Sequence, residues 1–421
     1  MDDFDVIIIG AGIAGTTCAI LCARAGLSVL LVERAEHPGS KNLSGGRLYG
    51  YALHDILPDF QHMAPLERPI VRESFSLLSA TGETTLSHQQ PDSPSWSILR
   101  ARFDPWYATQ AQLAGAECLY GVTVDALHRE GERIRGILCE GDRLNARVVV
   151  LAEGANSVLA EQSGLIEKPP LNSMALGIKE TLALEPEQLE ARFHLEESDG
   201  AAWLFTGSLC GDQPAGAFIY THHHSLSLGI VAPLSSLRDG PYNVSELLSR
   251  FKSHPTLRPL LRGAQTLEYG AHLVPEGGLR SIPLRRAGTG WLLAGDTLRT
   301  CINTGVTVRG MDMAILSGAA AARTLIAAQT APEKALHVLY DQQLKQSLLW
   351  QQLTRYQHHA ALFQRGTWYQ EWPAFCHALV ADLSRADTRV NPPLWRSIFH
   401  HAKRFGLRRL TADILRSLRC L

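Results

Sequence analysis

The sequence lacks a large excess of charge of either sign. Its 40 lysine and arginine residues almost balance its 41 aspartate and glutamate residues, so the formal net charge is −1. A whole-molecule field of that size does not attract a polyanion, although it permits a local basic patch. We therefore expect no nucleic-acid partner.

A cluster of cysteines is also lacking. The eight cysteines are scattered along 421 residues, and only Cys18 and Cys22 lie close together, one helical turn apart. An iron–sulfur cluster needs several thiolates brought together at short spacings. We expect no metal site in this chain and interpret the Cys18–Cys22 pair as core packing.

Long hydrophobic runs are scarce as well. Glycine, alanine and charged residues interrupt each apolar stretch before the ~18 residues that cross a bilayer. The start Met1-Asp2-Asp3 has none of the basic residues of a signal peptide. We expect a cytoplasmic protein whose membrane contact, if any, is peripheral and at the inner face of the cytoplasmic membrane.

The sequence does contain a dinucleotide-binding pattern at its start. Residues 4–9 are predicted as a strand, residues 16–25 as a helix and residues 28–32 as a second strand. After the first strand comes Gly10-Ala11-Gly12-Ile13-Ala14-Gly15, which fits G-x-G-x-x-G. Its glycines permit a tight turn, a close approach to a pyrophosphate and tight helix–strand packing, and the helix N-terminus attracts the phosphates. We predict a diphosphate-binding βαβ unit.

Two acidic residues extend this pattern. Glu33 ends the second strand, 18 residues after Gly15, where it can accept hydrogen bonds from an adenosine ribose. Asp296 ends the apolar segment Trp291-Leu292-Leu293-Ala294-Gly295, ahead of a predicted helix from 305 to 328. An Asp at such a strand end can contact the ribityl or pyrophosphate part of a flavin, and the helix dipole can stabilise a reduced flavin. The alternative for Asp296 is a simple helix cap. The two features together favour FAD over NAD.

The rest of the chain predicts a second domain and a helical tail. Residues 36–58 are predicted as an irregular loop across the ligand, and residues 174–232 as an antiparallel sheet. We predict an α/β fold of para-hydroxybenzoate-hydroxylase-like architecture. A Rossmann-type FAD-binding domain is formed by residues 1–65, 96–170 and 270–330. An inserted antiparallel sheet domain for substrate or quinone is formed by residues 66–95 and 171–269, and residues 331–421 form a helical C-terminal region.

Several further segments resemble a known family. They are Val32-Glu33-Arg34, Gly39-Ser40-Lys41-Asn42 through Gly45-Gly46-Arg47-Leu48-Tyr49, Ile98-Leu99-Arg100 with Phe103-Asp104, Leu151-Ala152-Glu153-Gly154-Ala155-Asn156-Ser157, Val274-Pro275-Glu276-Gly277-Gly278 and Thr307-Val308-Arg309-Gly310-Met311-Asp312. Together they are similar to electron transfer flavoprotein–quinone oxidoreductases, and most of all to the FixC-like bacterial branch. The resemblance covers about residues 4–330.

This resemblance implies specific site residues. Arg47 and Arg100 would contact FAD, and Gly305 to Thr307 would begin the helix that faces the flavin ring. The alternative for the two arginines is a solvent-exposed position. The complete set of predicted cofactor-binding residues is Gly10, Ala11, Gly12, Ile13, Ala14, Gly15, Glu33, Arg34, Gly46, Arg47, Arg100, Val124, Gly295, Asp296, Gly305, Val306 and Thr307. No catalytic residue is predicted.

The chain departs from the family at two points. Larger relatives carry a cysteine-ligated iron–sulfur cluster that this chain cannot hold, so an iron–sulfur centre, if one is used, would come from a separate ferredoxin-like subunit. Thr297-Leu298-Arg299 replaces residues that tend to be small in relatives.

The C-terminal residues 396–421 form a basic amphipathic segment. The segment contains seven lysines and arginines but only one acidic residue, Asp413. Such a helix can lie on an anionic membrane or bind an acidic partner. The alternative is an ordinary solvated face of a core helix.

The resemblance implies electron flow from an electron transfer flavoprotein through FAD to a quinone. Two alternatives remain open at this point. One is a flavin-dependent monooxygenase or isoprenoid double-bond reductase that uses NAD(P)H, because the fold does not decide function. The other is a FAD-containing docking subunit without turnover.

Overall fold

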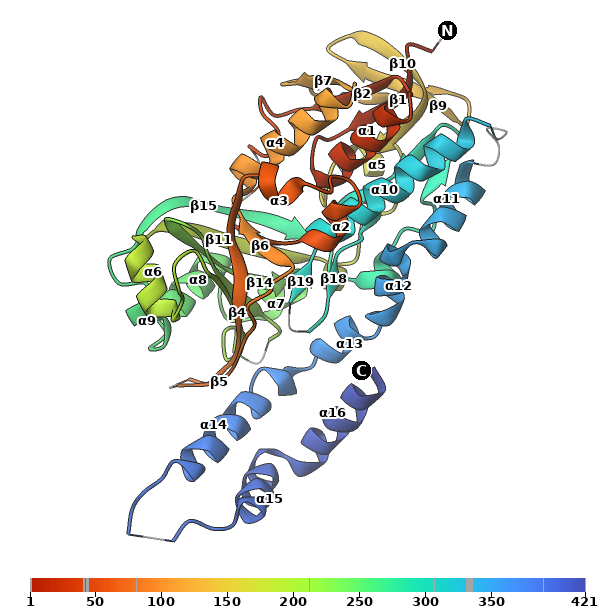
Figure 1. Ribbon diagram of the computed structural model, residues 1–421. Helices are drawn as coiled ribbons and strands as arrows, with labels where there is room; N and C mark the ends of the chain where they lie inside the picture. Colours follow the sequence, from red (N-terminus) through yellow and green to blue (C-terminus); the bar gives the residue numbers. More distant parts are fainter. Residues whose placement is uncertain are drawn as a thin grey trace.

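The described part of the protein contains two large sheets, the helices that pack on them, a small two-stranded sheet and a series of C-terminal helices (Figure 1). The computed structural model describes residues 2–40, 42, 45–80, 82–211, 213–305, 307–330, 336–388 and 390–420, with only the backbone for residues 418–420. The predicted contact Val306 lies outside the described residues.

The first sheet contains the predicted βαβ unit. β1 (Phe4–Ile9) lies between the parallel strands β2 (Val29–Glu33) and β10 (Asp142–Leu151). Ile7 and Ile8 in β1 are fully buried, as expected of a parallel strand covered on both faces. The other strands of this sheet are β7 (Glu117–Tyr120), β8 (Ala126–Glu130), β9 (Arg133–Cys139), β16 (Ala287–Gly288) and β17 (Trp291–Leu293). The order β16-β17-β10-β1-β2-β7 confirms the predicted Rossmann-type fold.

Helices cover this sheet. α1 (Ile13–Arg24) and α10 (Met311–Ala328) pack so closely that a Cβ at Gly318 would lie 2.2 Å from the Ala14 carbonyl oxygen. The other helices of this layer are α2 (Gly50–His54), α3 (Phe60–Met63), α4 (Arg100–Leu113), α5 (Val158–Gln162), α11 (Leu336–Gln346) and α12 (Leu348–Arg355). α10 has the length and composition of a membrane-spanning helix, which corrects the expectation that no run is long enough. Because 61% of it is buried inside the protein, it packs as a core helix.

The second sheet has nine strands in the order β15-β11-β14-β13-β12-β4-β6-β3, with β5 paired to β4. The strands are β3 (Gly46–Tyr49), β4 (Leu66–Leu78), β5 (Glu83–Gln89), β6 (Ser95–Ile98), β11 (Ala175–Ala183), β12 (Gly200–Gly207), β13 (Gly216–Thr221), β14 (Ser225–Pro233) and β15 (Gln265–Val274). Helices cover one face of this sheet, and the core between them and the sheet includes Leu189 and Phe251. Those helices are α6 (Pro186–Phe193), α7 (Leu234–Asp239), α8 (Val244–Ser253) and α9 (Leu257–Leu260).

Two local predictions need correction. The segment 36–58 is not wholly irregular, because residues 46–49 pair with β6 as strand β3 and residues 50–54 form α2. The helix predicted from Gly305 begins at Met311 instead. β18 (Ile302–Asn303) pairs antiparallel with β19 (Val308–Arg309), and Gly305 between them has φ +85°. The domain boundaries stay a prediction, although the pairing places β3, β6 and the end of β15 in the second sheet.

The C-terminal helices extend towards the bottom of Figure 1, and the first of them still contributes Phe363 to the body. They are α13 (His359–Phe363), α14 (Glu371–Leu383), α15 (Leu394–Phe405) and α16 (Leu407–Cys420). α16 is attached through buried Asp413, which accepts hydrogen bonds from Arg365 Nη1 at 2.9 Å and Thr367 Oγ1 at 2.6 Å. The one acid of the basic segment is therefore a structural anchor.

Candidate cofactor and substrate site

A large cavity of about 730 Å³ lies between the two sheets. The carboxyl ends of β1, β2 and β10 open into it through Ile9, Val32 and Ala152, which is where ligands of doubly wound folds bind. Fourteen of the predicted contacts line the cavity: Gly10, Gly12, Ile13, Ala14, Glu33, Arg34, Gly46, Arg47, Arg100, Val124, Gly295, Asp296, Gly305 and Thr307. Ala11 and Gly15 belong to the same loop but do not line it.

The glycine loop has one open face. Gly10 has φ +104°, and a Cβ there would lie 2.4 Å from the Ala152 carbonyl oxygen. A Cβ at Gly15 would lie 2.0 Å from the Gly10 carbonyl oxygen. Gly12 differs, because no atom lies within 4 Å of its Cβ position and it faces the cavity at the N-terminus of α1. Gly12 thus leaves room for a ligand, whereas Gly10 and Gly15 leave room for the protein's own backbone.

Glu33 is fixed beside this loop by two backbone groups. Its Oε2 accepts the Ala11 N–H at 3.0 Å and its Oε1 accepts the Ala35 N–H at 2.9 Å. A carboxylate has about four lone-pair sites, so acceptor capacity remains for the hydroxyls of a ribose. The geometry suits an adenosine at this end of the cavity.

Asp296 carries an unsatisfied oxygen. It lies in a 3₁₀ turn, residues 295–298, at the end of β17, and its Oδ1 is buried without a hydrogen-bond partner among the described residues. Burial raises the pKa of Asp296 to about 6, and nearby Arg100 opposes that rise. A buried acceptor without a partner is costly, so a ligand hydroxyl is the expected partner.

The two predicted arginine contacts already have protein partners. Arg47 forms a bidentate ion pair with Glu73 at 2.9 and 2.6 Å, and Arg100 forms one with Asp104 at 2.6 and 2.7 Å. Neither arginine is solvent-exposed, and both still line the cavity. Their contact with FAD stays a prediction.

The departure at Thr297-Leu298-Arg299 has a structural explanation. All three residues are buried away from the cavity. Thr297 Oγ1 donates to the Gly154 carbonyl at 3.2 Å, and the Arg299 guanidinium donates to the carbonyls of Ser281 and Glu167. These residues join neighbouring segments behind the site.

Three further residues of the cavity wall have no role predicted from the sequence. They are Lys179 on β11, His272 on β15 and Glu276 just after β15. Burial lowers the pKa of Lys179 to about 8 and of His272 to about 4, and it raises the pKa of Glu276 to about 7. A charged residue within an otherwise apolar strand, as in Ala175-Leu176-Gly177-Ile178-Lys179, is the signal that could have found Lys179.

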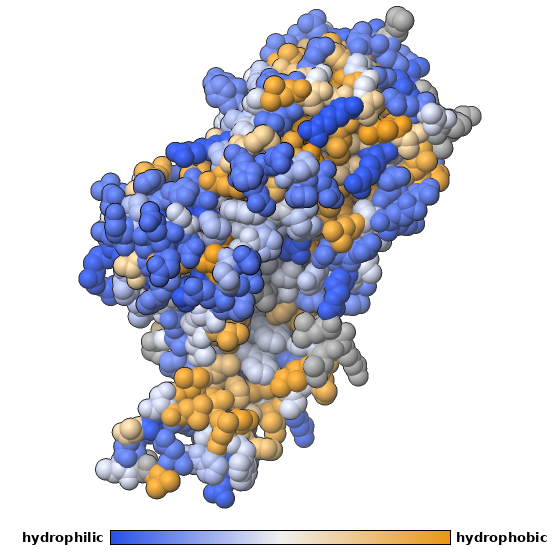
Figure 2. All heavy atoms as spheres, in the orientation of Figure 1, coloured by the Kyte–Doolittle hydropathy of each residue, from blue (hydrophilic) through white to orange (hydrophobic). Residues whose placement is uncertain are grey.

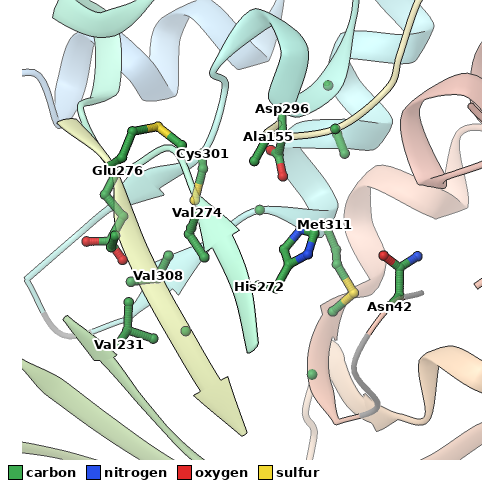
Figure 3. A pocket seen from close by; sticks show the side chains of 18 of the residues that line it. Asn42, Ala155, Val231, His272, Val274, Glu276, Asp296, Cys301, Val308 and Met311 are labelled. Carbon is green, nitrogen blue, oxygen red and sulfur yellow. The ribbon is translucent and has the colours of Figure 1, made fainter. Parts of the chain in front are cut away.

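Figure 3 shows how part of this wall is arranged. Asp296 and His272 lie on one side with Met311, the first residue of α10, and Glu276 lies on the other side near Val231 and Val308. The N-terminus of α10 therefore reaches the cavity at Met311, where its dipole can stabilise negative charge on a ligand. A flavin adenine dinucleotide fits this set of features: the glycine loop for the phosphates, Glu33 for the ribose, the unsatisfied oxygen of Asp296 and the dipole of α10.

The buried Glu276 gives a pH prediction for the FAD-free protein. Its raised pKa means that the folded state keeps this proton to higher pH than the unfolded chain does. The contribution of Glu276 to the free energy of unfolding is therefore fully present below the pKa that Glu276 has in the unfolded chain. It is lost as the pH rises through about 7. The wild type should therefore lose up to about 1.4 kcal/mol per pH unit relative to Glu276→Gln between about pH 5 and pH 7. Urea unfolding across this range measures the difference, and parallel curves for the two proteins would contradict it.

Comparisons with known proteins agree with this geometry. Residues 5–162 match the family described as FAD dependent oxidoreductase. The probable electron transfer flavoprotein-quinone oxidoreductase YgcN of Escherichia coli K12 is 58% identical over 421 residues, and each chain is covered completely. Protein FixC of Salmonella typhi is 37% identical, with 100% of this chain and 99% of the relative covered.

Among solved structures, a geranylgeranyl bacteriochlorophyll reductase-like protein from Thermoplasma acidophilum has a TM-score of 0.73. It is 18% identical, with 98% of this chain and 100% of that chain covered, so it supports the fold alone. The cofactor is FAD. The chain is thus a FAD-dependent electron-transfer oxidoreductase, and it belongs to the electron transfer flavoprotein–quinone oxidoreductase family in its FixC-like bacterial branch.

Proposed function

We propose that this protein passes electrons from an electron transfer flavoprotein to a quinone through FAD held in the cavity between the sheets. The observation that carries the proposal is the 58% identity to a probable electron transfer flavoprotein-quinone oxidoreductase over the complete length of both chains. The cavity agrees with it, because beyond the phosphate loop its wall includes apolar Val231, Val274 and Phe363, which suit an apolar ring.

The predicted residues have distinct roles in this proposal. Gly12 and the N-terminus of α1 bind the diphosphate, Glu33 binds the adenosine ribose and Asp296 binds a ribityl hydroxyl. The N-terminus of α10 stabilises negative charge at the flavin ring. Bound FAD supplies the electron chemistry, since it can accept electrons singly and deliver two.

The electron donor is tested by the first half of the reaction. Under anaerobic conditions the oxidised protein is mixed with a reduced electron transfer flavoprotein, or with NADPH, while the absorbance of this protein's own flavin is resolved from that of the donor's flavin. Rapid bleaching by the flavoprotein and slow bleaching by NADPH support the proposal. The reverse pattern favours a monooxygenase or a double-bond reductase, and a flavin that no donor reduces favours a docking subunit without turnover.

A ferredoxin-like subunit remains part of the proposal. Among the described residues no group of three or more His, Cys, Asp or Glu side chains could hold a metal ion. If the pathway uses an iron–sulfur centre, a separate protein supplies it. Co-purification of such a protein with the intact complex, with iron absent from this chain alone, is the supporting result.

We further propose that the C-terminal helices lie on an anionic membrane surface, at the inner face of the cytoplasmic membrane. Figure 2 shows hydrophobic residues gathered over this extension, and the exposed ones include Leu394, Trp395, Ile398 and Phe399 of α15. Basic residues Arg396, Lys403, Arg404, Arg408 and Arg416 are exposed around them. Apolar side chains that insert into the bilayer and cations that contact lipid headgroups would hold the protein at the membrane, where a membrane-dissolved quinone can reach it.

The double variant Trp395→Ser/Phe399→Ser should lose most of its binding to phosphatidylglycerol vesicles and keep its FAD. Both side chains are 60% exposed, so their loss removes no core packing. Leu113→Ser, a 76% exposed residue at the end of α4, is the matched control and should bind as the wild type does. Vesicle co-sedimentation at low and high salt measures the effect, since screening weakens the basic contribution. Unchanged binding by the double variant would contradict this proposal.

A further inference from the structure

Glu276 is an acid in the cavity wall that the cofactor contacts above do not use. It follows β15 directly and lies inside the protein, where burial raises its pKa to about 7. Its Oε2 accepts a hydrogen bond from Asn303 Nδ2 at 3.1 Å, and its Oε1 has no partner among the described residues. Asn303 comes from β18, so the acid is positioned by a separate segment of the chain.

The hydrogen bonds of Asn303 decide which oxygen carries the proton. The Gly305 N–H can only donate, and it donates to Asn303 Oδ1 at 2.8 Å. The Asn303 amide must therefore present its NH₂ group to Glu276, which makes Glu276 Oε2 an acceptor. When the carboxyl is protonated, its proton belongs on Oε1, and the described residues offer no acceptor for it. A ligand could supply the missing acceptor, and a carbonyl oxygen would serve.

The surroundings of Glu276 are uncharged. Figure 3 shows its carboxyl near Val231 and Val308. The titratable groups that face it are Cys301 and Tyr369, whose pKa values burial raises so that both stay neutral. The Tyr369 hydroxyl already donates to the Phe363 carbonyl at 2.6 Å. The charged groups of the wall, Lys179 and Arg100, influence His272 rather than Glu276, and burial keeps His272 neutral near pH 7.

We propose that Glu276 is the acid of the substrate site, where its carboxyl donates a hydrogen bond to a quinone carbonyl oxygen and then transfers its proton to that oxygen. This inference rests on the proposed quinone reductase function. A quinone is a flat apolar ring with two carbonyl acceptors and no donor, so a neutral acid among valines matches its chemistry. A group with a pKa near the working pH is also well suited to proton transfer.

The proton balance requires such a group. Reduction of a quinone to a quinol takes up two electrons and two protons, of which FAD bound in the cavity would, once reduced, supply both electrons and one proton. The second proton comes from Glu276: its O–H bond breaks as an O–H bond forms on the quinone oxygen, which leaves a Glu276 carboxylate. Solvent then returns the proton to the carboxylate before the next turnover.

Binding of decylubiquinone to the oxidised holoprotein tests the proposal without turnover. The perturbation of the flavin spectrum gives the dissociation constant from about pH 5.5 to about pH 8.5. Wild-type affinity should fall up to about tenfold per pH unit above about pH 7, because an ionised carboxylate then faces the carbonyl. Glu276→Gln keeps an N–H donor that does not ionise, so it should bind at every pH and lose this dependence. Asp296, whose pKa is about 6, is unchanged in that variant. A pH dependence near pH 6 that both proteins share therefore belongs to Asp296, and only the loss of affinity above about pH 7 tests Glu276.

The rates provide a second measurement. Glu276→Gln should slow quinol formation by about 10²–10⁴-fold, while its FAD content and its flavin reduction by the donor match the wild type. A pH-independent wild type, a variant that keeps the loss of affinity above about pH 7, or a variant with wild-type quinol formation would overturn the role of Glu276. Failure of the wild type to bind the quinone at any pH would instead overturn the proposed function itself.

Discussion

Gly12→Val is expected to give a folded protein that purifies without FAD. The backbone at Gly12 has φ −73° and ψ 178°, which any residue adopts, and no protein atom lies within 4 Å of the Cβ position. The valine side chain would instead fill the space beside the N-terminus of α1 that a pyrophosphate needs. FAD per chain after gel filtration should fall at least tenfold, while the circular dichroism spectrum of the apoprotein stays native.

Gly10→Ala is the matched contrast. That Cβ would meet the Ala152 carbonyl oxygen at 2.4 Å and would require φ near +104°. This variant should lose stability as well as FAD, because it strains the link between β1 and β10. If Gly12→Val retained a full complement of FAD, the diphosphate site would be elsewhere.

The second large effect concerns the ion pair between buried Asp104 and Arg100, whose side chain is only 19% exposed. The Asp104 side chain is 1% exposed and accepts hydrogen bonds from Nε and Nη2 of Arg100 and, at 2.7 Å, from Asn42 Nδ2. Asp104→Ala would leave the guanidinium without its partner inside the cavity wall. We expect about 3–5 kcal/mol of destabilisation, measured by urea unfolding, together with weaker FAD retention.

Arg238 and Asp239 provide a control with the same geometry at the surface. They form the same bidentate contact at 2.6 and 2.7 Å, but both side chains are more than half exposed. Solvent screens such a pair, so Asp239→Ala should unfold as the wild type does. Equal losses of unfolding free energy in the two variants would mean that burial does not determine how much the Arg100–Asp104 ion pair contributes to stability.

The sequence predicted what local patterns determine. The strand, glycine loop and second strand around Gly12 follow from hydrophobic runs and glycine spacing, and the Asp296 turn follows from an apolar strand that ends in Gly-Asp. These signals lie within a few residues of one another, so no tertiary information is needed. The Rossmann-type fold and the FAD cofactor follow from them.

What the sequence missed depends on distant pairing. β3 joins β6 about 50 residues away, and β12 pairs in parallel with β4 more than 120 residues earlier, so the second sheet could not be bounded from local runs. The start of α10 was placed too early because Gly305 and Thr307 lie between β18 and β19, which pair with each other. Likewise Lys179, His272 and Glu276 become one wall only when β11 and β15 are side by side.

The most direct test of the central claim is complete turnover under anaerobic conditions. A reduced electron transfer flavoprotein and decylubiquinone are incubated with catalytic amounts of the wild type or of Gly12→Val, and the quinol formed is measured by absorbance. We predict quinol formation that requires the wild-type protein and its FAD, and none above background with Gly12→Val. The proposed electron transfer would be contradicted if the wild-type flavin stayed oxidised in the presence of the reduced electron transfer flavoprotein. It would also be contradicted if the flavin were reduced without formation of quinol.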